Sequence, residues 1–446
     1  MIKAIWQKIN NKHFLSLAGN GIMAVMSMVT VALLFRFLSS EHMGYWVLFQ
    51  TFSVLVDTFR TGFLQVALIK FYTGTDIDRA KKVLGSIWYL AVMITLVFCL
   101  INAALIPFLP YIKDEGFVIV IQWVGLSLLA ILPSAIATWI LQADQRFDLI
   151  LIFRFLSQGS FILAIITLIF TNHLSLRSVL MAYVIINAII SVGILFAGWS
   201  RASTIIHRTK ESIVEIYHFG KFSVGTTISA NLLRASDTII IGSFMGPAAI
   251  AIYNLPNRLM ELIEIPIRST LATGMSSMAK AVNSNNKKEV AYILAKYSGT
   301  LMLAFIPVSI GAILLADVAI SLLGGGKYIH TEAANLYRYF MVIAIFYPVE
   351  RFIAVGLDII HQPKINFIKV TIMLIANVIC DFIGIKVFNS LYGVAVATTI
   401  PLIIGILFGY YHLKKHIDFS FREVILSGRI QIRRIIRTYI TKRKHT

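Results

Sequence analysis

The stretch "MGYWVLFQTFSVLVDTFRTGFLQVALI" at residues 43–69 is long enough to cross a bilayer as a helix, yet it carries an aspartate and an arginine. A second stretch, "AAIAIYNLPNRLMELIEIPIRSTLAT" at residues 248–273, has the same character. A transmembrane helix needs roughly 20 mostly apolar residues, and a charge at its centre costs about 2.5 to 3.5 kcal/mol on insertion scales. Such charges should face a bundle interior or a wet cavity. The two stretches therefore predict a membrane protein with a polar path.

Hydrophobic runs of this length recur along the whole chain. Of its 446 residues, 58% are hydrophobic and only 14% are charged, which is far from the balance of a soluble domain. The runs lack the alternation of barrel strands, and unpaired strand edges cannot survive in lipid, so helices are expected. The sequence therefore predicts an all-α polytopic membrane protein with about twelve spans, at residues 14–38, 43–69, 83–109, 117–141, 149–170, 176–199, 222–245, 248–273, 292–323, 333–357, 365–388 and 391–411.

The formal charge of +19 is distributed in a way that argues against nucleic-acid binding. Basic residues gather on alternate connections between the spans, whereas the opposite connections hold few. Under the positive-inside rule, this pattern predicts that both termini are cytoplasmic. The basic connections contain Arg79, Lys81 and Lys82, then Arg201, Arg208 and Lys210, and then Lys280, Lys287 and Lys288.

The longest polar connection before the tail, residues 200–221, divides the spans into two sets of six. We expect an N-terminal six-helix bundle at residues 1–199, this connection as a cytoplasmic linker, and a C-terminal six-helix bundle at residues 222–411. Residues 412–446 combine an apolar helical face with many arginines and lysines. Such a basic amphipathic tail is expected to lie on anionic lipid at the inner leaflet.

An ungapped alignment with an offset of 207 residues places the first charged stretch over the second and aligns Asp57 with Glu264. Both are the second span of their half, and both run from outside to inside in the predicted topology. They therefore predict a parallel repeat, as in transporters whose halves rock about a central site. Because prolines free carbonyls and permit bends, Pro256 and Pro266 make residues 248–273 the expected hinge.

The sequence contains no motif for enzymatic chemistry. It has no glycine-rich phosphate loop ending in Lys-Ser or Lys-Thr, so ATP hydrolysis is not expected, and it has no nucleophile elbow. His412 and His416 have a spacing that can bind a metal, but they stand among lysines without a third ligand, which favours a solvated tail. We therefore predict a transporter without a cofactor or metal site, rather than an enzyme.

The polar residues inside the predicted spans are the candidate functional residues. Arginines converging in one cavity would suit a phosphate anion, because a guanidinium stays charged and matches phosphate oxygens bidentately. Carboxylates beside them could carry a coupling proton or sodium ion. Opposite charges one helical turn apart also allow structural pairing, so both interpretations stay open. The candidates for substrate binding are Arg60, Arg154, Arg234, Arg258, Arg268, Gln50, Asn254 and Asn257, and those for ion coupling or charge pairing are Asp57, Asp237, Glu261, Glu264 and Asp381.

Several motifs resemble those of a known family. They are "LLFRFLSSEHMGYWVLFQ" at 33–50, "RTGFLQVALIKFYTG" at 60–74, "LQADQRF" at 141–147, "GLDIIHQPKINFIKVTIMLIANVICDFIGI" at 356–385 and "LYGVAVATTI" at 391–400. Together they resemble the polysaccharide-biosynthesis, Wzx-like flippases of the multidrug/oligosaccharidyl-lipid/polysaccharide (MOP) exporter superfamily. This resemblance covers nearly the whole chain.

The resemblance implies two MATE-like six-helix bundles around a central cavity, in the bacterial cytoplasmic (inner) membrane. It implies alternating access that moves an undecaprenyl-diphosphate-linked oligosaccharide to the outer leaflet, for O-antigen, capsule or exopolysaccharide synthesis. A polysaccharide polymerase or chain-length machinery would then be a partner. The family's cationic lumen maps onto Arg60, Arg154, Arg234 and Arg258. Span one has no arginine at its middle, a departure that makes the peptidoglycan precursor a less favoured substrate.

Two other classes of protein are weighed against a flippase. A MATE-like drug or cation antiporter on the same fold should have acidic residues in the first bundle, and span one, residues 14–38, has neither an acid nor a proline. A polysaccharide polymerase or acyltransferase should have a sizeable external loop or a catalytic constellation, whereas the predicted outer loops are short. Both observations favour the flippase.

Overall fold

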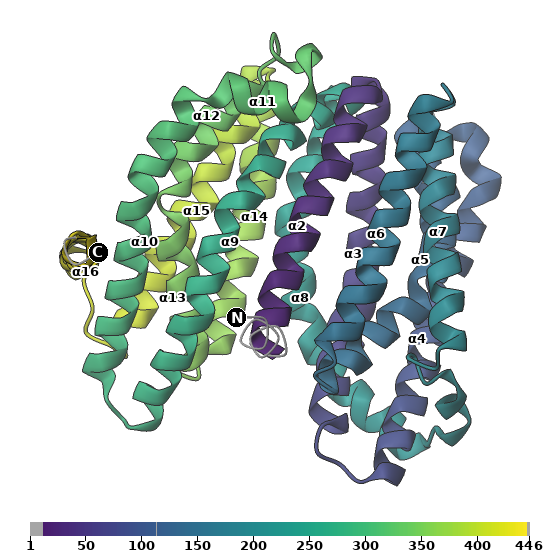
Figure 1. The fold of residues 1–446 in the computed structure, drawn as a ribbon, viewed down its shortest axis with the longest axis horizontal. Helices are drawn as coiled ribbons and strands as arrows, with labels where there is room; N and C mark the ends of the chain where they lie inside the picture. The colour runs from purple at the N-terminus through teal and green to yellow at the C-terminus, as the bar shows by residue number, and fades with distance from the viewer. Residues whose placement is uncertain (1–11, 113, 444–446) are drawn as a thin grey trace. The chain divides into compact units, whose positions relative to one another are not determined.

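The computed structural model describes residues 12–112 and 114–443, and the regular structure of these residues is entirely helical (Figure 1). The chain divides into two compact units. The N-terminal unit comprises Met1–Asn231 with Met245–Ala251, and the C-terminal unit comprises Leu232–Phe244 with Ile252–Thr446. The helices α8 (Lys210–Met245) and α9 (Pro247–Asn283) each contribute to both units.

In the N-terminal unit, α3 packs against α4 and α5, α5 packs against α7, and α2 packs against α6. The buried core beside α3 is formed by side chains such as Leu64, Ile87 and Ile136. Each long helix starts at a polar cap where the sequence allows one, for example Ser39 before α3 and Asp76 before α4, since capping satisfies free N–H groups. The elements are α2 (Lys12–Phe37), α3 (Ser40–Tyr72), α4 (Ile77–Leu105), η1 (Ile106–Tyr111), α5 (Glu115–Ala143), α6 (Phe147–Phe170), α7 (Leu176–Phe196) and η2 (Ala202–His207).

In the C-terminal unit, α14 packs closely against α15, and α13 contacts α10, α14 and α15. Its largest described core contains Leu294, Phe352, Ile353 and Leu413. The remaining elements are α10 (Lys287–Leu314), α11 (Ala316–Gly324), η3 (Gly326–Tyr328), α12 (Ala333–Ala344), α13 (Tyr347–Ile359), α14 (Pro363–Phe388), α15 (Leu391–Lys414) and α16 (Phe421–Arg443).

Most predicted spans follow one long helix, but residues 292–323 fall on α10 and α11, and residues 333–357 fall on α12 and α13. Not every helix is apolar enough to count as a span. In the described part of the chain, eight helices are long and apolar enough to cross a membrane, and a bent pair would make nine. The polar α8 and α9 are not among them, and Gly21–Phe37 of α2 is a shorter apolar helix. The chain is thus a multi-pass, all-helical membrane protein. The number twelve and the side of the termini, whose residues 1–11 and 444–446 lie outside the described residues, stay predictions.

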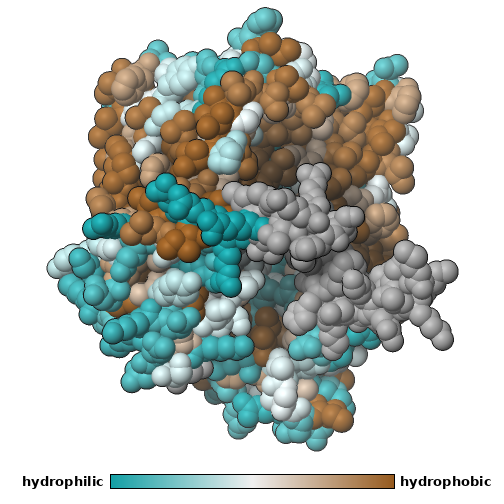
Figure 2. Space-filling view, turned by 60° about the vertical axis from the view of Figure 1, so that its left-hand side comes forward, coloured by the Kyte–Doolittle hydropathy of each residue, from teal (hydrophilic) through white to brown (hydrophobic). Residues whose placement is uncertain are grey.

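Large apolar side chains cover much of the surface. Leu100, Phe196 and Leu314 are each more than two thirds exposed, which a protein in water would avoid but lipid allows. Figure 2 shows one face on which hydrophobic residues gather over a broad area while hydrophilic residues gather toward one end. This surface fits a chain embedded in a bilayer.

The connection expected at residues 200–221 is only partly a loop. η2 packs on α4, where the Trp88 indole donates to the Ser200 carbonyl at 2.7 Å, and Lys210 already begins α8. Thr209 caps that helix by accepting from the Ser212 N–H. The two compact units therefore separate after Asn231, inside α8, rather than in the polar connection.

The hinge expected in residues 248–273 is not where the structure bends. α9 runs unbroken through Pro256 and Pro266, whereas the axes of α12 and α13 differ by 48°. Pro348 stands in the first turn of α13, where a missing N–H leaves no intrahelical bond unmade. The tenth predicted span is consequently a bent pair. A hinge motion in α9 stays a prediction, since an unbroken helix with two internal prolines can still bend.

The basic tail folds as α16 and packs across α10. A Cβ atom on Gly428 would lie 2.4 Å from the Gly299 carbonyl carbon, so the two helices cross at a distance that only glycine permits. Val424 is 1% exposed and joins the buried core, whereas Arg429 and Arg433 are exposed. Figure 1 shows α16 nearly end-on beside α10. Its first half is thus docked on the C-terminal unit, and its contact with anionic lipid stays a prediction.

Candidate functional site

In the N-terminal unit, Arg60 of α3 finds its ion-pair and hydrogen-bond partners within the helix bundle. Arg60 is 2% exposed and forms an ion pair with Asp57. Its Nη1 donates to Thr95 Oγ1 of α4 at 3.2 Å and to the Leu128 carbonyl of α5 at 3.4 Å. Because its donors are shared among three helices, Arg60 ties α3 to its neighbours and has little left to offer a substrate.

Arg154 of α6 is in the opposite situation. It is half-buried, and it makes no hydrogen bond or ion pair with any residue that the structure describes. One turn further along α6, Gln158 donates to Thr30 Oγ1 at 2.6 Å, and Gln50 of α3 contacts the Tyr183 hydroxyl. A guanidinium carries five N–H donors, so Arg154, unlike Arg60, has donors available for an anion.

In the C-terminal unit, a chain of charges runs from α9 through α13 to α14. Glu264 pairs with Arg268 on its own helix and lies 3.8 Å from Arg351 Nη2. Arg351 Nη1 is 3.8 Å from Glu350 Oε2, and Glu350 Oε1 accepts from Lys369 Nζ at 2.6 Å. Lys369 is fully buried. The chain of charges therefore begins at the exposed Arg268 and ends at the buried Lys369.

Two further arginines lie beside this chain. Arg258 Nη1 donates to Glu261 at 2.7 Å, but its Nε is buried without a partner. Arg234 of α8 makes no hydrogen bond or ion pair within the described ranges, and the charges that act on it include those of Arg351 and Glu264. We call the whole group the cationic cluster. It holds five cations against three carboxylates, namely Arg234, Arg258, Arg268, Arg351 and Lys369 with Glu261, Glu264 and Glu350.

A separate polar cluster joins α8, α9 and α14. Asp237 Oδ2 accepts from the Tyr253 hydroxyl at 2.7 Å. The Asn377 amide nitrogen lies 2.6 Å from Asp237 Oδ1 and 2.9 Å from Asp381 Oδ2. Asp381 is fully buried, and its Oδ1 has no partner among the described residues. Asp237 is half-buried, and both carboxylates lie at the same amide nitrogen. Like charges placed together in this way raise the cost of ionising both carboxylates, which a proton or a cation between them would relieve. We call this group the carboxylate pair.

The carboxylate pair, rather than any group of conventional ligands, is the place where an ion could bind. No cluster of three or more His, Cys, Asp or Glu that could hold a metal occurs among the described residues. Asp237 and Asp381 supply carboxylate oxygens, while the Asn377 amide nitrogen donates to both of them. The Thr398 hydroxyl lies 3.3 Å from the Tyr253 hydroxyl. Hard oxygen ligands of this kind suit a proton or a small hard cation.

Some contacts of the candidate residues were predicted from their spacing along one helix, and others were not. The i, i+3 and i, i+4 pairs Asp57–Arg60, Arg258–Glu261 and Glu264–Arg268 are present. Asn254 donates to Thr238 at 3.3 Å, and Asn257 is half-buried beside Arg258. Sequence reasoning missed Lys369 as a site residue. Its only signal was a lysine near the start of the apolar run 365–388, whose other lysine, Lys386, lies close to the far end.

The fold matches solved transporters of one superfamily. A structure described as "Lipid II flippase MurJ, inward closed conformation" aligns with a TM-score of 0.74 at 18% identity, over 96% of this chain and 92% of that one. An inward-facing multidrug resistance MATE family transporter of the MOP superfamily also aligns with a TM-score of 0.74, at 16% identity over 88% of this chain and 95% of that one. At these identities the likeness shows the fold, which is that of MOP superfamily transporters.

The sequence narrows this class to one family. Residues 33–333 match the model described as "Polysaccharide biosynthesis protein", and the chain belongs to that family. It is also 20% identical over 230 residues to a probable low-salt glycan biosynthesis flippase Agl15 of Haloferax volcanii, covering 50% of this chain and 47% of that protein. It is 22% identical over 169 residues to the lipid II flippase MurJ of Bacillus subtilis, covering 37% of this chain and 31% of that protein. The matches thus span half or less of these curated relatives, both of which are named as flippases rather than enzymes.

Proposed function

We propose that this protein is a flippase for a lipid-linked oligosaccharide, carried on undecaprenyl diphosphate, in the bacterial cytoplasmic membrane. It would move the saccharide to the outer leaflet by alternating access, for O-antigen, capsule or exopolysaccharide synthesis, and would supply a polysaccharide polymerase or chain-length machinery. The observation that carries the proposal is the excess of cations in the cationic cluster. Family membership and the two flippases among its relatives support it.

The cationic cluster suits the diphosphate of such a lipid. Arg234 has no internal acceptor in the described chain, and Arg258 has a free Nε, so both can turn donors to phosphate oxygens. Guanidinium binds phosphate bidentately and stays charged at every physiological pH. Arg154 offers the same chemistry from the N-terminal unit. Asn254, Asn257 and Gln50 would contact sugar hydroxyls, while the prenyl chain stays in lipid.

The carboxylate pair would supply the coupling ion. If a proton or sodium ion binds between Asp237 and Asp381, its arrival neutralises a repulsion that otherwise opposes the packing of α8 against α14. The ion gradient would then bias one arrangement of these helices over the other, as a ligand with different affinities for two states must. The burial of Asp381 supports this role, because its Oδ1 accepts no hydrogen bond from a described residue and a proton or ion shared with Asp237 would satisfy it.

The flippase is tested by deleting the gene and finding the leaflet on which lipid-linked saccharide accumulates. Accumulation on the cytoplasmic side is expected, whereas accumulation outside would assign the protein to a polymerase or ligase step. In the complemented strain, Arg258→Ala and Arg234→Ala should abolish surface polysaccharide, and Arg258→Lys should restore only part of it. The matched control is Arg338→Ala, which removes an arginine that pairs with Asp317 in the same unit. Parental polysaccharide from properly inserted Arg234→Ala and Arg258→Ala proteins would contradict the assignment.

The coupling role is tested with Asp381→Asn, which keeps the shape of the side chain but removes its charge. Saccharide transport into inverted vesicles should respond to a sodium or proton gradient in the parent and should lose that response in the variant. Thr398→Val is the milder control, since its hydroxyl lies only at the edge of the cluster. A gradient response that survives in Asp381→Asn would exclude the carboxylate pair as the ion site.

A MATE-like drug or cation antiporter is the second candidate. The fold match to a MATE transporter and the carboxylate pair favour it, because a cationic drug could take the place of the coupling ion. The cationic cluster argues against it, since five cations would repel such a cargo. Loss of drug resistance on gene deletion, with surface polysaccharide unchanged, would establish the antiporter.

A further inference from the structure

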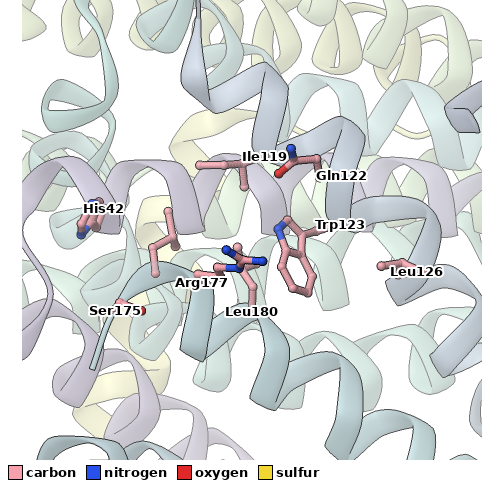
Figure 3. A pocket seen from close by; sticks show the side chains of 9 residues that line it. His42, Ile119, Gln122, Trp123, Leu126, Ser175, Arg177 and Leu180 are labelled. Carbon is pink, nitrogen blue, oxygen red and sulfur yellow. The ribbon is translucent and has the colours of Figure 1, made fainter. Parts of the chain in front are cut away.

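A cavity of about 550 Å³ lies in the N-terminal unit, away from the residues discussed so far (Figure 3). The starts of three helices form its wall. His42 comes from the first turn of α3, Gln122 and Trp123 come from α5, and Arg177 comes from the first turn of α7. In Figure 3 the Arg177 and Trp123 side chains reach into the same space.

Several polar side chains of this cavity make no hydrogen bond with a residue that the structure describes. The Arg177 guanidinium and the Trp123 indole N–H, which can only donate hydrogen bonds, are two of them. The side chains of Gln122 and His42, which can both donate and accept, are the other two. Ser175 is the exception, since Ser178 satisfies it within the capping box of α7. The cavity is open, since His42, Gln122 and Arg177 are exposed and Trp123 is half-buried. Its donors can therefore be reached from outside and fit a ligand rich in acceptor oxygens.

The rest of the cavity is apolar and continues into the lipid-facing surface. Leu176 and Leu180 line it from α7, and Leu126 lines it from α5. Gln122, Leu126 and Leu129 follow one face of α5 at helical spacing, and both leucines are about half exposed. A ligand with its head at the donors would therefore lay its tail along an apolar helix face.

The charged side chain that lines the cavity favours an anionic head. Arg177 lines it, whereas no aspartate or glutamate does, and the amino ends of α3 and α7 beside it carry partial positive charge. The acidic side chains at this end are those of Glu41, Asp114 and Glu115, whose charges act on Tyr45, and none of them lines the cavity. In the predicted topology, this is the extracytoplasmic end of the unit.

We propose that this cavity binds the phosphate head of a membrane lipid in the outer leaflet. Arg177 holds the phosphate, Gln122 and the Trp123 indole N–H add hydrogen bonds, and the upper part of the lipid chain packs on Leu126. Tryptophan suits this depth, because its ring is apolar and its N–H is polar. Two lipids share the chemistry, namely a bulk anionic phospholipid and the diphosphate lipid released after transport. The second of these lipids rests on the proposed function, whereas binding of the bulk phospholipid does not.

The experiment measures lipid retention by the purified, full-length protein with native mass spectrometry. The probes are phosphatidylglycerol, undecaprenyl diphosphate, diacylglycerol without a phosphate, and inorganic phosphate alone. We expect the two phosphate lipids to bind and the other two probes to bind at least about tenfold more weakly, because a charge-assisted bond contributes about 1.5 to 3 kcal/mol. Tighter binding of phosphatidylglycerol assigns the site to bulk lipid, and tighter binding of undecaprenyl diphosphate assigns it to the transported lipid.

Variants connect the binding to the cavity. Arg177→Gln and Trp123→Ala should each weaken retention of the better lipid, the former about tenfold. The control is Lys386→Gln, which removes a cation placed 4.5 Å from the Phe382 ring in the other unit, and it should leave retention unchanged. Equal retention by Arg177→Gln and Lys386→Gln would overturn the proposal. So would equal binding of diacylglycerol, or of inorganic phosphate, and phosphatidylglycerol. Transport is not measured, so failure here leaves the flippase proposal standing.

Discussion

The charged segments of α3 and α9 have similar sequences but different surroundings. In α3, Arg60 is buried and shares its donors with Asp57, Thr95 and Leu128. In α9, the arginines keep exposed surface, and the carboxylate of Glu264 reaches Arg351 on another helix. An arginine surrounded by acceptors of its own protein stabilises the fold, whereas one with spare donors can bind an anion. The difference separates a structural pair from a candidate substrate site.

The largest effect on stability is expected at the buried end of the chain of charges in the C-terminal unit, at Lys369. Lys369→Met leaves Glu350 without its nearest cation, and removal of one partner from a buried ion pair costs about 3 to 5 kcal/mol. We expect a large fall in the unfolding temperature of the detergent-solubilised protein, or failure to accumulate in the membrane. The double variant Glu350→Leu with Lys369→Met should recover much of the loss. A single variant as stable as the parent would show that Arg351 alone neutralises Glu350.

A smaller effect is expected at Arg60. Arg60→Met removes hydrogen bonds to three helices, yet the Asp57 side chain is 37% exposed and can be hydrated when its partner is lost. We therefore expect a loss of about 1 to 3 kcal/mol in the free energy of unfolding, measured by the same thermal assay. Transport should fall only in proportion to the folded protein. Lost transport at full stability would instead move Arg60 to the substrate site and remove the contrast with α9.

The smallest effect on stability is expected at Arg268, whose side chain is 69% exposed. Exposed ion pairs contribute about 0 to 1 kcal/mol, so Arg268→Gln should leave the unfolding temperature nearly unchanged. Transport should nevertheless decrease, because the cationic cluster loses one positive charge. The readouts are thermal unfolding and the amount of surface polysaccharide at equal protein level. A stability loss as large as that of Arg60→Met would make Arg268 a structural residue as well.

Hydropathy located the helices well, because each segment that crosses lipid must be apolar and must satisfy its own backbone hydrogen bonds. The runs 43–69 and 248–273 lie inside α3 and α9, and local spacing predicted the pairs within those helices. The observed bend was not predicted, however. Pro256 and Pro266 suggested a hinge in α9, which is one unbroken helix in the structure, since neighbouring helices can compensate for lost hydrogen bonds in a membrane helix. The break lies between α12 and α13, where Pro348 in the first turn of α13 was a local signal of the same kind.

Contacts between helices far apart in the sequence could not be predicted from spacing. Arg234 and Asp237 stand one turn apart and suggested a pair, yet Asp237 bonds Tyr253 and Asn377 instead. Lys369 looked like an isolated charge until α13 brought Glu350 to it. The cavity at Arg177 likewise exists only because three helix starts lie together.

The amino-acid sequence alone was enough to establish a helical membrane protein with charged spans, since hydrophobicity and helical periodicity are local properties. The sequence was also enough to identify the family, since the family model matches residues 33–333. Which charges are satisfied and which remain available depended on packing, because an ion pair or hydrogen bond requires two groups within a few ångströms. Arg60 and Arg234 are the same residue type in similar helices, and only their neighbours distinguish the structural arginine from the candidate for substrate binding.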